Sequence, residues 1–270
     1  MNENISNSNP GGKLTSSPVE KKNVSGALVG NACILIATIF WGMNVAVTKA
    51  LIPEWMTADG ITAVRLIGGA ALMWIVSLFV KDKPIEHHDW IKLFLGGAIV
   101  VIASSGSGSS SGSDKLLGDL LAVASTICYA FYLVILEGPT KKYRPSNMLR
   151  WVFLFAAIPA VCLIPGMDKM PILATPDARP WVEIGFILLC PTFFAYFLVQ
   201  PAVKRIGSEL VSIYQYLLPV FATLTAVLMG IDKLHWVQVA AMVVIVAGMI
   251  HTNLAKSHET KPTSTAGNGK

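Results

Sequence analysis

Single polar and aromatic side chains recur at helical spacing within long apolar stretches of this 270-residue chain. Thr192, Tyr196 and Gln200 share one helix face because they are four residues apart, and Trp41 and Asn44 share a face on another stretch. Rings, amides and hydroxyls that line a buried cavity hold small molecules by stacking and hydrogen bonding. We therefore predict that these side chains line a binding cavity for a small molecule.

Further candidates lie on other apolar stretches. Tyr129 and Tyr132 are about one turn apart on one stretch, and Tyr214 and Gln215 lie on adjacent faces of another. Aromatic residues also anchor helices at the membrane interface, and an amide such as that of Asn44 or Gln215 also joins two helices by a hydrogen bond. A structural role is therefore the alternative for each of these side chains.

Arginine is the most costly residue within these stretches. A charged side chain at the centre of a transmembrane helix costs at least ~2.5 kcal/mol. Arg65 lies about one turn inside its stretch, where it either balances an anionic group on the ligand or extends its side chain to the interface. Arg150 lies nearer the end of its stretch, so we expect its side chain to reach the interface.

The residues used for catalysis, metal binding or phosphate binding form no recognisable pattern. The sequence has no G-x-x-x-x-G-K-[ST] loop, and its apolar stretches hold no H-E-x-x-H, serine–histidine or paired-carboxylate set. The four cysteines lie in apolar stretches without C-x-x-C spacing and are interpreted as small buried side chains. We therefore expect no enzymatic activity, no cofactor and no metal site.

Eight apolar stretches must position the candidate residues. A helix needs about 20 apolar residues to cross a hydrocarbon core of ~30 Å. The chain is 53% hydrophobic and 14% charged, whereas soluble chains carry about 25% charged residues. The sequence therefore predicts an all-α polytopic membrane protein with about eight transmembrane helices. The stretches are residues 32–51, 61–80, 91–103, 116–136, 149–165, 181–200, 210–231 and 236–253.

The stretch at residues 91–103 is shorter than the others, and a Ser/Gly run follows it at residues 104–113. Thirteen residues reach only about 20 Å in an α-helix. We expect this segment to cross the membrane all the same, either because it thins the bilayer, because flanking residues lengthen it, or because neighbouring helices cover it.

The distribution of Lys and Arg predicts the orientation. If all eight stretches span and the N-terminus is inside, 14 basic residues lie on the cytoplasmic side and 4 outside; if residues 91–103 do not span, the counts are 10 and 8. We therefore predict that both termini are cytoplasmic. The net charge of +5 then belongs to the loops, and no basic stripe interleaved with aromatic residues suggests a nucleic-acid partner.

Four short segments have the order and spacing of motifs from a known family. Phe40-Trp41-Gly42-Met43-Asn44 and Ala63-Val64-Arg65-Leu66 are similar to its first-helix and second-helix motifs. Gly118-Asp119-Leu120-Leu121-Ala122 is similar to the opening of its second repeat, and the run from Tyr214 through Pro219 to Gly248 is similar to its last two helices. The chain thus resembles the EamA-type branch of the drug/metabolite transporter superfamily.

The resemblance implies ten helices in two inverted five-helix repeats, and the ungapped similarity of residues 37–42 to residues 125–130 is typical of such repeats. The chain departs from this pattern near residue 100, where the fourth helix of the first repeat and much of the third and fifth are absent. The predicted division is a disordered cytoplasmic tail at 1–30, an incomplete first repeat at 31–103, a Ser/Gly linker at 104–115, a second repeat at 116–255 and a disordered cytoplasmic tail at 256–270.

The resemblance implies a secondary transporter that exports small metabolites, amino acids or drug-like compounds across the cytoplasmic (inner) membrane. Its partners are then the lipid bilayer and a small-molecule substrate. The alternative is a truncated, non-transporting membrane protein or an interaction subunit that forms a homodimer through its second half, because the absent helix should help to wall the cavity. The predicted substrate-binding residues are Trp41, Asn44, Arg65, Tyr129, Tyr132, Tyr196, Gln200, Tyr214 and Gln215.

Overall fold

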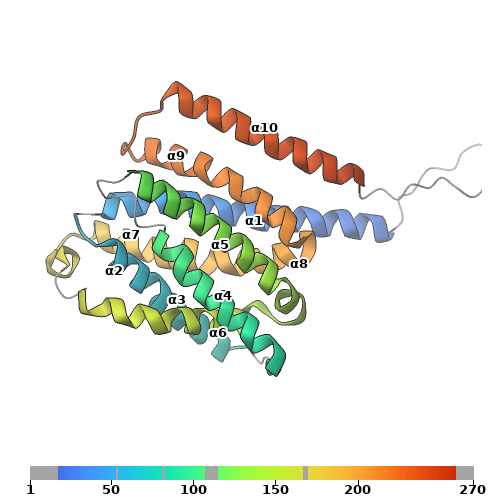
Figure 1. Ribbon diagram of the computed structural model, residues 1–270, viewed down its shortest axis with the longest axis horizontal. Helices are drawn as coiled ribbons and strands as arrows, with labels where there is room; N and C mark the ends of the chain where they lie inside the picture. The colour runs from blue at the N-terminus through green and yellow to red at the C-terminus, as the bar shows by residue number, and fades with distance from the viewer. Residues whose placement is uncertain (1–17, 53, 81–82, 107–114, 167–169, 260–270) are drawn as a thin grey trace, which may run out of the picture.

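The computed structural model describes residues 18–52, 54–80, 83–106, 115–166 and 170–259, and these residues form helices and loops with no strand. The helices run lengthwise in an elongated bundle (Figure 1). The all-α class predicted from the sequence is thereby confirmed. Five helical segments are long and apolar enough to cross a membrane, so the chain is a multi-pass membrane protein: Ser25–Leu51, Ala58–Leu78, Val123–Lys142, Pro145–Ile164 and Arg179–Leu228.

Helix α1 (Pro18–Leu51) begins inside the region predicted to be a tail. The expectation of disorder at residues 1–30 is therefore wrong from Pro18 onward, and residues 1–17 lie outside the described part. Proline suits the first turn of a helix, where its missing N–H has no partner, and an existing helix extends at little cost. For the same reason α10 (Trp236–Glu259) continues past residue 256 into the second predicted tail; residues 260–270 lie outside the described part.

The second span consists of α2 (Ala58–Ala63), a π-helical turn η1 (Val64–Gly68) and α3 (Gly69–Leu78). It begins at Thr57, whose side chain accepts a hydrogen bond from the Gly60 amide at 3.2 Å. A π-helical turn adds one residue to the helix and turns the following side chains relative to those before it. Arg65 lies within this turn.

Helix α4 (His87–Gly106) contains the short apolar stretch and extends it at both ends. Its 20 residues correspond to about 30 Å, which is the thickness of a hydrocarbon core. Two glycines allow close packing: a Cβ on Gly96 would lie 3.0 Å from Leu136 of α5, and one on Gly97 would lie 2.7 Å from the Val152 carbonyl of α6. The helix continues to Gly106, so residues 104–106 of the predicted linker are helical, and Lys115 begins the next helix; the rest of the predicted linker, residues 107–114, lies outside the described part.

Helices α5 (Lys115–Lys142) and α6 (Pro145–Ala160) are joined by a tight turn, and α6 continues as the short η3 (Val161–Gly166). After η4 (Pro171–Ala174), the next span comprises α7 (Arg179–Ile187), the π-helical η5 (Leu188–Phe194) and α8 (Ala195–Tyr214). Within α8, Gly207 has a φ of 82°, which suits glycine, and the chain reverses there. It then returns through η6 (Gln215–Leu217) and α9 (Leu218–Leu228), so the 50-residue apolar segment is two antiparallel helices.

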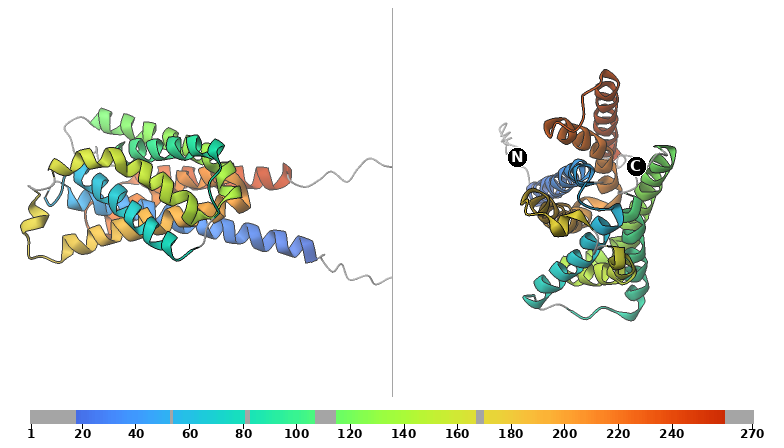
Figure 2. Two further views of the ribbon diagram at one scale, coloured as in Figure 1. Left: turned by 90° about the horizontal axis from the view of Figure 1, so that it is seen from below. Right: turned by 90° about the vertical axis from the view of Figure 1, so that its left-hand side faces the viewer.

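The two ends of the bundle differ. At one end, which we call the closed end, Lys49 of α1 lies 3.5 Å from Asp232 in the loop before α10, and an apolar cluster that includes Leu51, Met170 and Ile187 joins α1, α7 and the segment near η4. At the other end, the start of α1 packs on α8, and α10 also ends there (Figure 2). The main apolar core lies between these ends, among α1, α3, α4, α5, α6 and α8.

Candidate functional site

Four of the predicted binding residues form one aromatic cluster in the main core. The ring of Trp41 from α1 lies 5.2 Å from that of Tyr129 and 5.7 Å from that of Tyr196, both in edge-to-face geometry. Tyr132 stacks on Tyr129 at 5.6 Å and meets Tyr196 edge-on at 6.0 Å. Helices α1, α5 and α8 thus each contribute rings to one place.

A hydrogen bond to an irregular turn holds the indole of Trp41. Its Nε1 donates to the Pro191 carbonyl at 2.9 Å. Pro191 lies within η5, where its ring removes a backbone N–H and disturbs the regular bonding of the helix. The carbonyl of Ile187, the residue just before this turn, accepts the Thr192 hydroxyl at 2.9 Å. The missing N–H of the proline leaves the Ile187 carbonyl, four residues earlier, open to the Thr192 hydroxyl, whereas Trp41 bonds to the carbonyl of the proline itself.

Arg65 joins the site through the same turn. Its Nε donates to the Thr192 hydroxyl oxygen at 3.3 Å, and the residue is only 8% exposed. No carboxylate lies within ion-pair distance of this guanidinium in the described part of the chain. Of the two alternatives for Arg65, extension to the interface does not fit this burial, because the side chain is enclosed beside the π-helical turns η1 and η5; its role in binding stays a prediction.

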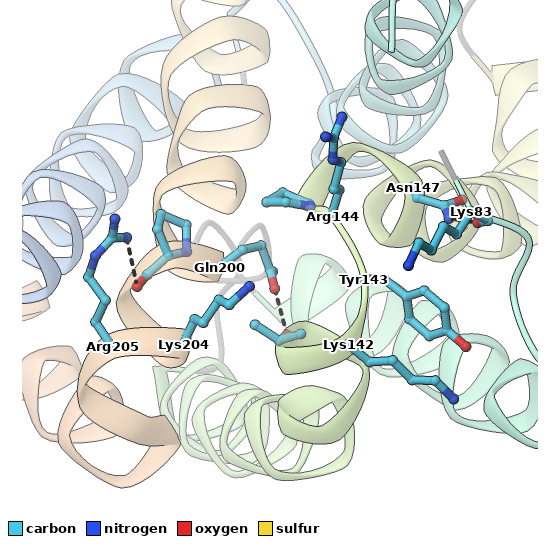
Figure 3. A pocket seen from close by; sticks show the side chains of 11 residues that line it. Lys83, Lys142, Tyr143, Arg144, Asn147, Gln200, Lys204 and Arg205 are labelled. Atoms are coloured by element: carbon cyan, nitrogen blue, oxygen red, sulfur yellow. Dashed lines mark hydrogen bonds between the residues drawn. The ribbon is translucent and has the colours of Figure 1, made fainter. Parts of the chain in front are cut away.

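Gln200 connects the aromatic cluster to a pocket at the end of the bundle opposite the closed end. The buried Thr140 hydroxyl donates to Gln200 Oε1 at 2.7 Å. Both residues line a cavity of about 630 Å³ between the α5–α6 junction, the loop before α4 and α8 (Figure 3). Thr192, Tyr196 and Gln200 are all buried, and they form a continuous line along one helix face from Arg65 to this pocket.

Basic side chains dominate the walls of this pocket, which we call the cationic pocket. Its lining is Lys83, Thr140, Lys142, Tyr143, Arg144, Pro145, Asn147, Gln200, Pro201, Lys204 and Arg205. Lys142 turns away from the centre in Figure 3 and pairs with Glu86 and with Asp89, the latter at 3.1 Å. The ammonium group of Lys204 is directed toward Gln200 in the same view.

A carboxylate beside the pocket holds the α4 and α5 ends together. Asp89 accepts the Tyr143 hydroxyl at 2.8 Å and pairs with Lys142 and, at 3.4 Å, with Lys92. Burial raises the pKa of Asp89, but the hydrogen bonds from Tyr143, Lys142 and Lys92 outweigh this effect and hold the pKa below its usual value. The carboxylate therefore stays charged and serves as a fixed anchor for two lysines.

Besides Arg65 and Gln200, three predicted residues lie outside the aromatic cluster. Asn44 is buried one turn from Trp41, and its Oδ1 has no hydrogen-bond partner among the described residues. Tyr214 and Gln215 follow the reversal at Gly207; the Tyr214 ring packs at the margin of the main core, and Gln215 Nε2 has no partner in the described ranges. Their roles in binding remain predictions.

Arg150 contacts side chains of α3 and α6. Its guanidinium donates to Ser77 and, at 2.8 Å, to Asn147, and it lies 5.5 Å from the ring centre of both Trp74 and Trp151. Its Nε has no hydrogen-bond partner among the described residues. That its side chain reaches the interface stays a prediction.

Sequence reasoning missed the cationic pocket. One signal was available: Lys204 continues the four-residue spacing of Thr192, Tyr196 and Gln200 along the same helix face. Lys83 and Arg144 come from two other segments, and nothing in their local sequence indicates that they meet Lys204.

These features define a helical membrane protein with a polar and aromatic line inside the bundle. Residues 116–254 match the EamA-like transporter family, which covers more than half of the chain. The chain belongs to this family, and it is a membrane transporter. No solved structure matches it.

Two relatives extend the similarity to the first half of the chain. An uncharacterized transporter of Archaeoglobus fulgidus is 24% identical over 84% of this chain and 84% of its own length. The uncharacterized inner membrane transporter YedA of Escherichia coli K12 is 23% identical over 86% of this chain and 72% of its own. Both alignments therefore extend beyond residues 116–254, the part of the chain that matches the family.

Proposed function

We propose that this chain is a secondary transporter that exports small metabolites, amino acids or drug-like compounds across the cytoplasmic (inner) membrane by alternating access. Both termini lie in the cytoplasm, and the cationic pocket faces it. The observation that carries the proposal is the line from the cationic pocket through Gln200 and Tyr196 to Arg65. It supplies polar contacts at both ends of an aromatic cluster inside a membrane-spanning bundle.

The asymmetry of the bundle supports alternating access. Apolar residues around Leu51 and Ile187 pack together at the closed end, whereas the cationic pocket opens at the other end. A carrier that exposes its site to one side at a time needs such a difference between its two ends. The structure described here then corresponds to the form that is open to the cytoplasm.

The irregular turns supply places where the helices can bend. The π-helical turns η1 and η5 pack against each other, and Pro191 lies within η5. Prolines and π-helical turns weaken regular helix bonding and are where helices kink. Movement at these two turns would shift Arg65 and Thr192 together, because a hydrogen bond joins them.

The experiment is flux into proteoliposomes that contain the purified protein. We expect saturable uptake of some members of a panel of labelled amino acids, small metabolites and amphiphilic drugs. Trp41→Ala should lower the flux by about tenfold or more, since it removes both a ring contact and a hydrogen bond. The matched control is Trp236→Ala, whose ring is 88% exposed and should not affect flux.

A folding control separates loss of function from loss of structure. Trp41→Phe keeps a ring in the cluster. The Trp41→Ala and Trp41→Phe variants are both compared with the wild type by thermal unfolding in detergent. No flux above protein-free liposomes for any compound, from wild-type protein that unfolds cooperatively, would contradict the proposal. It would favour a truncated or interaction-only membrane protein.

A further inference from the structure

We propose that the substrate site of this transporter selects organic anions with an aromatic or apolar body, which meet the cationic pocket first and Arg65 second. This inference rests on the proposed transport function and adds the charge of the ligand to it. Three observations carry it: the unpaired cations of the pocket, the unpaired guanidinium of Arg65, and the helix face that connects them.

The cationic pocket has a positive charge that the residues described in the structure do not balance. None of its eleven lining residues is acidic. Lys83, Arg144, Lys204 and Arg205 form no ion pair in the described part of the chain, whereas Lys142 is engaged by Glu86 and Asp89. A cavity of about 630 Å³ has the size of a small-molecule site. Four unpaired cations around such a space favour a carboxylate or a phosphate group.

Arg65 presents the same charge deeper in the bundle. Arg65 and Asp89 are the charged residues that the bundle buries among those described. Asp89 pairs with two lysines and accepts the Tyr143 hydroxyl, whereas the guanidinium of Arg65 has only the Thr192 hydroxyl as partner within the described ranges. A buried cation is stabilised by an anion that approaches with good hydrogen-bond geometry. A cationic ligand would meet no buried carboxylate there.

One helix face joins the two positive sites. Thr192, Tyr196, Gln200 and Lys204 follow each other at four-residue spacing. Twelve residues of helix correspond to about 18 Å, so this face reaches from the pocket to the level of Arg65. The rings of Tyr196, Tyr132 and Trp41 flank its middle part. Rings of this kind hold the apolar body of a ligand, while the cations at either end hold its anionic group.

The competing explanation is topological, since cytoplasmic loops of membrane proteins are enriched in Lys and Arg without any ligand. A test must therefore compare ligands that differ only in charge. Phenyl phosphate, 2-phenylethanol and the 2-phenylethylammonium ion share a phenyl body and are anionic, neutral and cationic at pH 7.5. Their affinities are measured by isothermal titration calorimetry on the protein in nanodiscs of phosphatidylcholine.

We expect phenyl phosphate to bind at least about tenfold more tightly than the other two compounds, since each charge-assisted hydrogen bond is worth about that factor. The double variant R144Q/K204Q should weaken its binding at least about tenfold, and Arg65→Gln should weaken it more than Arg65→Lys. The matched control is Lys141→Gln, because Lys141 is exposed, pairs with Glu137 and does not line the pocket. Equal affinity for the ammonium compound, or an unchanged affinity in R144Q/K204Q, would overturn the inference.

A second arm distinguishes a soluble anion from a lipid headgroup. We expect phenyl phosphate to bind with similar affinity when the nanodiscs contain phosphatidylglycerol. If that lipid abolishes binding, and co-purifies with the wild type but not with R144Q/K204Q, the pocket holds a headgroup and the inference is wrong.

Flux measurements separate this inference from the transport function itself. If liposomes with the protein take up neutral or cationic compounds but no anions, transport stands and the anion inference fails. If phenyl phosphate binds as expected but none of the panel compounds moves, the anion site stands and the transport proposal fails.

Discussion

The guanidinium of Arg65 and the hydroxyl of Thr192 lie 3.3 Å apart although 127 residues separate them in the chain. Each residue lies in a π-helical turn, and Thr192 in turn donates to the Ile187 carbonyl. The position of a buried charge is thus set by two irregular turns from the two halves of the molecule. This bond is the point at which helix packing and the proposed ligand site meet.

Thr192→Val should destabilise the protein, because it keeps the shape of the side chain but removes the oxygen that accepts from Arg65. An unpartnered buried donor costs about 1–3 kcal/mol. The measurement is thermal unfolding in detergent. Thr192→Ser keeps the hydroxyl, so its unfolding temperature should lie much closer to that of the wild type. Equal unfolding temperatures for the Val and Ser variants would show that the Arg65–Thr192 bond contributes nothing.

Gly97→Ala should disturb the packing of α4 on α6. The added Cβ would lie 2.6 Å from Phe155 Cβ and 2.7 Å from the Val152 carbonyl oxygen, and a backbone atom cannot move aside cheaply. Overpacking of this kind costs about 1–3 kcal/mol. Gly185→Ala is the matched control, since a Cβ there meets nothing within 4 Å. This substitution should raise the free energy of unfolding by about 0.5–1 kcal/mol, as Gly→Ala does within other helices. Stabilisation of both variants would contradict the close packing of α4 on α6.

The stability of the protein should depend on pH through the carboxylate of Asp89. Its pKa in the folded protein is below its usual value, which is about 3.9 in an unfolded chain. Such a group contributes stability above the unfolded pKa, and this contribution is lost as the pH falls through the folded pKa. The unfolding temperature of the wild type should therefore exceed that of Asp89→Asn most at neutral pH. This difference should shrink below about pH 4. A difference that grows in acid would contradict the assignment.

Asp232 should be dispensable for proton-coupled steps. The Lys233 amide and the nearby Lys49 hold the pKa of Asp232 below its usual value, so this exposed carboxylate stays charged across the physiological range. A proton carrier needs a pKa near its working pH. Asp232→Asn should thus leave the pH profile of flux unchanged in proteoliposomes. A profile that shifts in this variant would assign Asp232 a part in coupling.

Local spacing predicted the parts of the site that lie on one helix. Thr192, Tyr196 and Gln200 share a face because the helix period is a property of the segment itself, and the structure buries all three. The positions of the apolar stretches likewise follow from hydrophobic length, and each one is largely helical in the structure, some across two or three consecutive helical elements. The predicted tail failed at Pro18 because polar composition says little about a helix that extends from a neighbouring span.

Features that join distant segments could not be predicted in this way. The cationic pocket needs Lys83, Arg144 and Lys204 from three segments, and their meeting depends on tertiary packing. The contact between Arg150 and Ser77 joins α6 to α3, and nothing in the local sequence of either residue indicates it. The π-helical turn at Pro191 has a local cause in the proline, yet its use by Trp41 depends on how α1 packs.

The proposed substrate route requires that α4 and α5 cross the membrane in opposite directions, because only then does the cationic pocket face the cytoplasm. Single cysteines at Lys115 and Lys141 are introduced into a variant without the native cysteines and labelled in intact cells with a membrane-impermeant maleimide. We predict that Lys115→Cys reacts from outside and that Lys141→Cys reacts only after the cells are opened. Labelling of both positions from the same side would contradict the arrangement and remove the basis for the proposed substrate route.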